Sequence, residues 1–174
     1  MIPNILTTVR MLLTPIFAYL VLEAKNLPWA AVILILSGLT DVADGFIARH
    51  YNMTSNFGKI YDPFADKLMQ ITTVLSLTIA QVIPLWVVAV VFVKEMTMIL
   101  IGGMLYLKHI AVHSNWYGKA ATVLFYTIIF VLIVWQGIPS LWMWTLLAIL
   151  LFSMLFAAGG YLVSTIEKIK KERV

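Results

Sequence analysis

The sequence has no cysteine and few charged residues. None of its 174 residues is Cys, and only 11% are Asp, Glu, Lys or Arg. The lack of cysteine excludes disulfides and thiolate metal sites. A soluble domain is typically about 25% charged and about half apolar, whereas this chain is 62% hydrophobic with a mean hydropathy of +0.97. We therefore predict a membrane-embedded protein with one domain over residues 1–174 and no separate soluble domain.

Six stretches are long and apolar enough to cross a bilayer as helices. Crossing the hydrocarbon core takes roughly 20 mostly apolar residues, and a lone strand cannot satisfy its backbone in lipid. The predicted helices cover residues 5–24, 29–49, 59–81, 84–107, 117–137 and 140–166. Residues 1–10 are predicted to begin as a short interfacial segment before the first span. The fold class is therefore an all-α, polytopic membrane bundle of six transmembrane helices.

The basic residues indicate which way the bundle faces. With six spans both termini lie on one side, and nine basic residues fall on that side: Arg10, Arg49, Lys59, Lys108, Lys119, Lys168, Lys170, Lys171 and Arg173. Only Lys25 falls on the other. Because basic loops favour the cytoplasm, we expect an inner-membrane protein with both termini and the site described next facing the cytoplasm. The net charge of +4 indicates contact with anionic lipid rather than with nucleic acid.

All four aspartates of the chain lie in the stretch 41–66. Asp41 and Asp44 are three residues apart and Asp62 and Asp66 are four apart, so each pair shares one helix face. An antiparallel helix pair joined by a loop over residues 50–58 would bring the two faces together. Carboxylates are costly at membrane depth, so this cluster is by default a functional-site hypothesis.

Crowded carboxylates need compensating charge, and hard oxygen ligands select Mg²⁺, Mn²⁺ or Ca²⁺. The cluster therefore predicts a divalent-cation site. One alternative is that the aspartates pair with bases or cap helices, with Arg49 and Lys67 as the nearby cations. Another is the proton or cation pathway of a transporter. Such pathways usually distribute acids across the membrane, whereas these cluster on two helices beside one loop.

The acidic stretch resembles the signature of the CDP-alcohol phosphotransferase family. It reads Asp41-Val-Ala-Asp44-Gly45-Phe-Ile-Ala48-Arg49, eight residues, then Gly58-Lys-Ile-Tyr-Asp62-Pro-Phe-Ala-Asp66, and it fits every defined position. The opening from Ile2 to Arg10 also resembles the bacterial members that make phosphatidylglycerol phosphate. The resemblance implies an enzyme that moves a phosphatidyl group from CDP-diacylglycerol to glycerol 3-phosphate and releases CMP. Alternatives are a cardiolipin synthase with phosphatidylglycerol as acceptor, or an inositol phosphate or serine acceptor.

The resemblance also implies roles for individual residues. Two Mg²⁺ or Mn²⁺ ions would be held by Asp41, Asp44, Asp62 and Asp66, with Asp66 also acting as general base. The CDP-lipid would be contacted by Asn4, Ile5, Leu6, Thr7, Gly45, Arg49, Ser55 and Gly58. The acceptor would be contacted by Lys119, Lys67 and Arg10. Lys119 has an alternative reading, which is an ordinary lysine of the cytoplasmic side.

Two further features bear on helix contacts. Lys94-Glu95 lies inside the fourth predicted span and resembles a basic–acidic pair of the phosphatidylglycerol-phosphate synthases, with a structural ion pair as the alternative. The pairs Gly102-Gly103 and Gly159-Gly160 allow helices to approach closely. We expect a homodimer.

Overall fold

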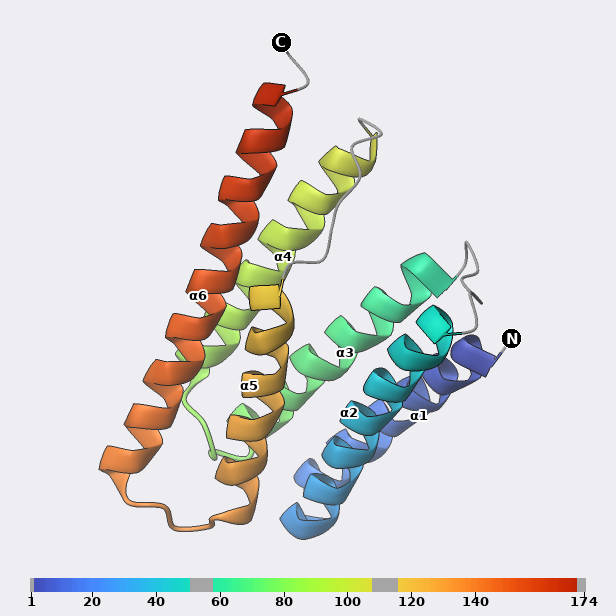
Figure 1. Ribbon diagram of the computed structural model, residues 1–174. Coiled ribbons are helices and arrows are strands. Elements are labelled where there is room, and N and C mark those ends of the chain that lie inside the picture. Colours follow the sequence, from blue (N-terminus) through green and yellow to red (C-terminus); the bar gives the residue numbers. More distant parts are fainter. Residues whose placement is uncertain (1, 51–57, 108–115, 172–174) are drawn as a thin grey trace. The chain divides into compact units, whose positions relative to one another are not determined.

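In this computed structural model, residues 2–50, 58–107 and 116–171 are described, and these ranges form six α-helices and no strand (Figure 1). Side chains are described within residues 5–43, 61–62, 64–100 and 118–163. The helices are α1 (Ile2–Leu22), α2 (Leu27–His50), α3 (Gly58–Ile79), α4 (Leu85–Leu107), α5 (Trp116–Val134) and α6 (Ser140–Lys171). The all-α prediction is confirmed, and each predicted helix is present with its ends shifted by a few residues.

Local chemistry explains where the helices begin and end. Asn26 is the N-cap of α2, since its Oδ1 accepts a hydrogen bond from the backbone N–H of Trp29 (3.3 Å). Pro84 lies just before α4, and its carbonyl accepts a bond from the N–H of Val87 (3.1 Å). Gly137, with φ of 81°, makes the turn between α5 and α6. These turn residues lie where the apolar runs stop.

The start of α1 differs from the prediction. Residues 1–10 do not form a separate short segment, because α1 runs without a break from Ile2 to Leu22 and contains Pro15. The reason is packing: Thr7 and Arg10 are buried on the same stripe as Phe17, further along the helix. Because the turn that carries Thr7 and Arg10 is packed against neighbouring helices, it remains part of α1.

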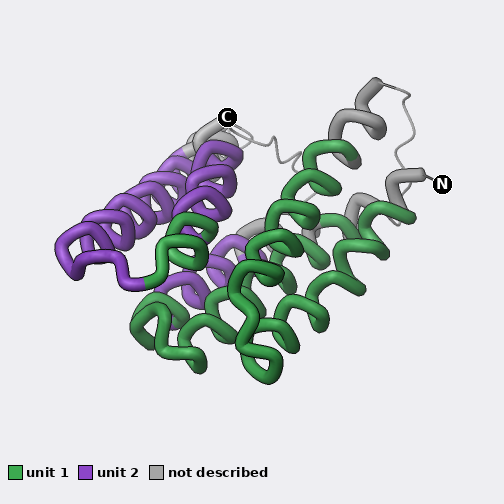
Figure 2. Tube along the Cα trace, turned by 90° about the horizontal axis from the view of Figure 1, so that it is seen from below, with its two compact units in different colours: residues 1–88, 130–136 green, residues 89–129, 137–174 purple. Residues whose placement is uncertain are grey.

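The helices fall into two compact units (Figure 2). The first unit comprises residues 1–88 and 130–136, and the second comprises residues 89–129 and 137–174. In the first unit α1 packs against both α2 and α3. The buried residues of α1 are spaced three or four apart and form one continuous stripe, namely Thr7, Arg10, Thr14, Phe17 and Val21. Helix α1 is therefore the centre of the first unit.

The packed interior of the first unit contains polar residues among its apolar ones, and the exposed faces are largely apolar. Seven buried side chains of α1, α2 and α3 are polar or charged: Thr7, Arg10, Thr14, Ser37, Gln70, Thr73 and Ser76. The exposed faces carry large apolar residues, such as Leu12, Leu39 and Ile79 at about 60% exposure. Large exposed apolar surfaces mark sites of contact with membranes or partners, which is consistent with lipid around the helices.

Two of the described helices contain segments that are long and apolar enough to cross a membrane. They are Ile5–Leu22 and Ser140–Val163, of which only 28% and 22% of residues are buried. Leu27–Ala43 and Gly118–Val134 are apolar but shorter. A low buried share is unlike the core helix of a soluble protein.

Packing around α1 generates a prediction about stability. Ala30 has no exposed area and lies on α2, the helix that packs on α1. Enlarging a small residue in a packed interface costs about 1–3 kcal/mol. We expect Ala30→Leu to lower the melting temperature in detergent, measured by thermal denaturation. The matched control is Ala89→Leu on the exposed face of α4, which should leave it unchanged; equal effects of the two would contradict tight α1–α2 packing.

Candidate active site

The first carboxylate of the acidic motif is held by an arginine from α1. Asp41 on α2 forms an ion pair with Arg10, with 3.0 Å between Asp41 Oδ1 and Arg10 Nη2. The Arg10 side chain has no exposed area, whereas that of Asp41 is 41% exposed. Arg10 therefore faces the interior, and Asp41 lies at the boundary between the packed helices and the surroundings.

The second helix of the motif is held by the same face of α1. Thr7 Oγ1 donates a hydrogen bond to Asp62 Oδ1 on α3 (2.5 Å). Thr7 is fully buried and Asp62 is half-buried. A hydroxyl cannot neutralise a carboxylate, but its hydrogen bond fixes the direction of one oxygen.

Thr7 and Arg10 lie three residues apart, which is roughly 4.5 Å along a helix axis. One turn of α1 therefore holds a carboxylate from α2 and a carboxylate from α3 at nearly the same level. The prediction placed these two aspartates on the facing surfaces of one helix pair, whereas in the structure each is held by α1, which packs on both α2 and α3.

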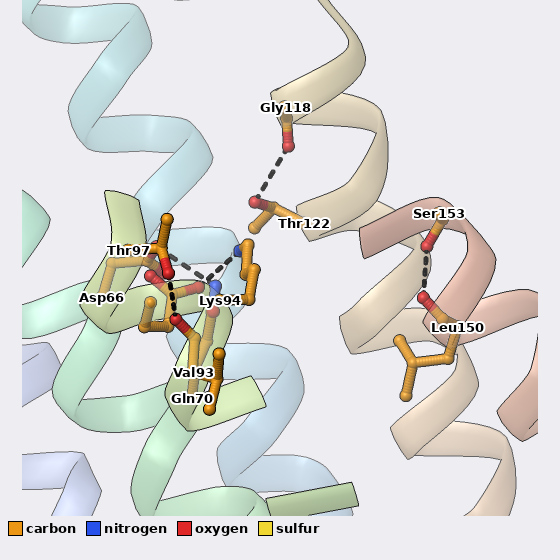
Figure 3. Close-up of polar contacts among 10 residues, drawn as sticks. Asp66, Gln70, Val93, Lys94, Thr97, Gly118, Thr122, Leu150 and Ser153 are labelled. Carbon is orange, nitrogen blue, oxygen red and sulfur yellow. Dashed lines mark hydrogen bonds and ion pairs between the residues drawn. The ribbon is translucent and has the colours of Figure 1, made fainter. Parts of the chain in front are cut away.

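Asp66 lies one turn beyond Asp62 on α3 and has a different partner. Gln70 Nε2 donates a hydrogen bond to Asp66 Oδ2 (3.2 Å), as Figure 3 shows. Gln70 is 3% exposed, and among the described residues its Oε1 has no hydrogen-bond partner. Because the amide is buried and its nitrogen is engaged, it holds one orientation of the Asp66 carboxylate. Lys67 follows Asp66 directly and is half-buried.

The donor set suits a hard divalent cation. Asp41 and Asp62 each use Oδ1 for their α1 partner, and within the described part of the chain Oδ2 of each has no hydrogen bond or ion pair. Free carboxylate oxygens are the ligands that Mg²⁺ and Mn²⁺ prefer. Among described residues no group of three or more His, Cys, Asp or Glu is gathered, and the Asp44 side chain lies outside them.

Several residues predicted for the site lie outside the described side chains. They are Asn4, Asp44, Gly45, Arg49, Ser55 and Gly58. Of the other predicted CDP-lipid contacts, Ile5 is 59% exposed and Leu6 is half-buried.

Two predicted features belong to the second unit. Lys94 Nζ and Glu95 Oε1 form an ion pair on α4, with Glu95 1% exposed (Figure 3). The structural ion pair considered for these residues is therefore present. Lys119 is exposed in the first turn of α5.

Sequence reasoning missed the role of Arg10 and did not single out Gln70. Arg49 and Lys67 were the predicted ion-pair partners of the aspartates, whereas Arg10 was predicted to contact the acceptor. The structure places Arg10 in the pair with Asp41, so the alternative of ion pairing holds in part for this aspartate. The sequence feature that could have indicated this role is the spacing of Thr7, Arg10 and Thr14, which places three polar residues in one stripe of an apolar helix.

Known proteins resemble the chain over most of its length. The profile of the CDP-alcohol phosphatidyltransferase family matches residues 1–157. The cardiolipin synthase (CMP-forming) of Streptomyces coelicolor is 35% identical over 127 residues, covering 70% of this chain and 59% of that protein. The human cardiolipin synthase (CMP-forming) is 37% identical over 99 residues, covering 56% of this chain and 33% of that protein.

A relative with a different named activity is also similar. The CDP-diacylglycerol–glycerol-3-phosphate 3-phosphatidyltransferase of Aquifex aeolicus is 42% identical over 77 residues, covering 44% of this chain and 43% of that protein. The chain thus spans less than two thirds of the length of each of these relatives.

The Thr7–Asp62 contact generates a prediction that separates hydrogen bonding from packing. Thr7→Val keeps the shape and removes the hydroxyl, whereas Thr7→Ser keeps the hydroxyl. A hydrogen bond to a charged group contributes about 1.5–3 kcal/mol. We expect Thr7→Val to lower the melting temperature and Thr7→Ser to stay close to the wild type, both measured in detergent. If Thr7→Ser lowers the melting temperature as much as Thr7→Val does, then packing and not the hydrogen bond holds Asp62.

Proposed function

The chain belongs to the CDP-alcohol phosphatidyltransferase family, and from this we propose that it is a membrane enzyme that transfers a phosphatidyl group from CDP-diacylglycerol to a glycerol hydroxyl and releases CMP. The family resemblance read from the motif is confirmed. The observation that carries the proposal is the holding of Asp41 and Asp62, both motif residues, by one turn of α1. We assign the activity to a single domain over residues 1–174.

The proposed reaction is a substitution at phosphorus. The acceptor hydroxyl oxygen forms a bond to the phosphorus that carries diacylglycerol, the pyrophosphate P–O bond breaks, and CMP leaves. The hydroxyl proton passes to Asp66, which we assign as general base. Its hydrogen bond from Gln70 supports this assignment, since it turns one carboxylate oxygen to a fixed direction.

We assign Asp41, Asp44, Asp62 and Asp66 as the residues that would hold two Mg²⁺ or Mn²⁺ ions. When bound, such ions neutralise and orient a pyrophosphate. Arg10 and Thr7 would keep Asp41 and Asp62 in place for this task, because each engages only Oδ1.

The CDP-lipid would be held by the remaining predicted contacts. Arg49 can offer a two-pronged set of donors to phosphate. The other assigned contacts are Asn4, Ile5, Leu6, Thr7, Gly45, Ser55 and Gly58.

Glycerol 3-phosphate is the acceptor we propose first. The Aquifex aeolicus relative carries this activity in its name, and an anionic acceptor near a carboxylate cluster needs a local cation. Lys67, beside Asp66, and Lys119 are our candidates for that cation. Arg10 was predicted there too, but its complete burial and its pair with Asp41 favour a positioning role.

Phosphatidylglycerol is the second candidate acceptor. It is supported by the named cardiolipin synthases, which align over a larger share of this chain than the Aquifex aeolicus protein does. Both acceptors present a glycerol hydroxyl on a molecule that bears phosphate, so the same site chemistry serves either.

We also propose that all six helices span the inner membrane, with the aspartates facing the cytoplasm, and that the protein is a homodimer. Apolar exposed faces on α2, α3, α4 and α5 support the additional spans, for example Leu39, Phe92 and Val123. The distribution of basic residues supports the orientation.

The metal assignment predicts the behaviour of a carboxamide variant. We expect Asp62→Asn, and chelation of the wild-type enzyme, to abolish CMP release from CDP-diacylglycerol, because a neutral amide cannot compensate cationic charge. Glu23→Gln removes an exposed carboxylate outside the motif and is the matched control that should stay active. Full activity in excess chelator, or near-normal turnover of Asp62→Asn, would exclude the metal role.

The acceptor assignment predicts which lipid is made. Radiolabelled CDP-diacylglycerol is offered with glycerol 3-phosphate, phosphatidylglycerol, inositol phosphate or serine, and the lipid product is identified. We expect product with glycerol 3-phosphate, and Lys119→Ala should raise KM for it by roughly tenfold, as expected for a charge-assisted contact. The KM for CDP-diacylglycerol should not change, and Lys171→Ala is the control. Product with phosphatidylglycerol alone would select the second candidate.

A further inference from the structure

A second polar feature lies in the first unit, at the other end of α1 from the aspartates. Helices α1 and α3 end there and α2 begins there (Figure 1). These ends line an open cavity of about 380 Å³, within the size range of small-molecule sites. Its wall is apolar at Val21, Leu27 and Ile79, and its two long polar side chains are Lys25 and Gln81.

Both polar residues of this cavity have an unfavourable backbone conformation. Lys25 has φ of 49° and Gln81 has φ of 59°, and they are the two non-glycine residues with positive φ in the described part of the chain. Glycine is favoured at such positions because a Cβ atom crowds the following carbonyl. At the turn after α5 the chain does use glycine, Gly137.

Backbone hydrogen bonds show that Gln81 terminates α3 and that Lys25 lies in the turn that follows α1. At the end of α3, the N–H of Val82 bonds the carbonyl of Leu77 (2.9 Å) and the N–H of Gln81 bonds that of Thr78 (3.0 Å). This is the Schellman arrangement, with Gln81 at the position where glycine is most common. At the end of α1, the N–H of Asn26 bonds the carbonyl of Leu20 (2.8 Å). Strained non-glycine residues cluster at functional sites, and here both line one cavity.

The cavity lies at the end of an apolar span. Leu22, a wall residue, is the last residue of the segment Ile5–Leu22. Fourteen residues separate Thr7 from Val21, or roughly 21 Å along a helix axis, so the cavity is distinct from the aspartate site. Tyr19 and Trp29, each 60% exposed, lie close in sequence, and such aromatic residues favour the headgroup layer of a membrane.

The charges around the cavity favour a ligand with both signs of charge. Lys25 is the one charged residue among those that line it, and it suits a phosphate. The C-terminal ends of α1 and α3 carry partial negative charge, and Gln81 offers an amide oxygen, so this side suits a cationic N–H donor. The apolar walls of the cavity suit the part of an acyl chain that lies next to the lipid headgroup.

We propose that this cavity binds a phospholipid with a phosphate and a primary ammonium group, that is, phosphatidylethanolamine, in the leaflet opposite the aspartates. Lys25 binds the phosphate, and Gln81 accepts a hydrogen bond from the ammonium group. The site is independent of the transfer reaction.

Binding of short-chain phosphatidylethanolamine tests the proposal. The purified protein is kept in detergent with excess chelator, and the rise of its melting temperature with lipid concentration gives an apparent Kd. Phosphatidylethanolamine should bind more tightly than phosphatidylcholine, which has no N–H donor, and than phosphatidylglycerol, which has no cation. Inorganic phosphate alone should give no shift. Equal shifts with phosphatidylglycerol or with phosphate would overturn the proposed ligand.

Two variants test the cavity itself. Lys25→Gly relieves the backbone while removing the cation, so it should keep or raise the lipid-free melting temperature and weaken lipid binding by roughly tenfold. Lys25→Arg, which keeps the charge, is the control. Ala80→Trp fills the cavity from an exposed wall position and keeps Lys25, so it should also abolish the shift.

The alternative outcomes are distinct. An unchanged apparent Kd in Lys25→Gly and in Ala80→Trp would place the lipid elsewhere and overturn the proposal. If Lys25→Gly lowers the lipid-free melting temperature, Lys25→Asn replaces it, because asparagine also tolerates positive φ. Failure here leaves CMP release untouched, so it is separable from failure of the proposed function.

Discussion

The ion pair between Arg10 and Asp41 is the interaction on which the described site depends. A guanidinium without exposed area needs a charge partner, since an unpaired buried charge is strongly unfavourable. Asp41 supplies it from α2 at 3.0 Å. One turn earlier, Thr7 bonds Asp62 of α3. Two polar residues of α1 thereby set the level at which α2 and α3 present their carboxylates.

The distribution of polarity follows from the same constraint. Polar groups in an apolar surrounding are favoured inside the protein, and six seryl, threonyl and glutaminyl side chains of α1, α2 and α3 are buried: Thr7, Thr14, Ser37, Gln70, Thr73 and Ser76. Apolar residues such as Leu12 and Leu39 are left on the outer faces. The interior can then hold a charged site, and the exterior suits lipid.

Charge is also used differently at the two ends of α1. At one end, Arg10 is fully buried and, within the described part of the chain, pairs with Oδ1 of Asp41. At the other end, Lys25 is exposed beside an apolar cavity and keeps a backbone conformation that glycine would adopt more readily. The two ends of α1 thus differ in how their charged side chains are exposed and paired.

The sequence by itself determined the six helices, the spacing of Asp41, Asp44, Asp62 and Asp66, and the family, because these depend on local periodicity and on a short contiguous motif. Only the tertiary structure decided which groups hold the aspartates. Thr7 and Asp62 are 55 residues apart, and no local pattern specifies which face of α1 meets α3. The stretch expected to form a separate short segment at the N-terminus is instead the first part of α1, because burial of Thr7 and Arg10 by other helices keeps that turn within the helix.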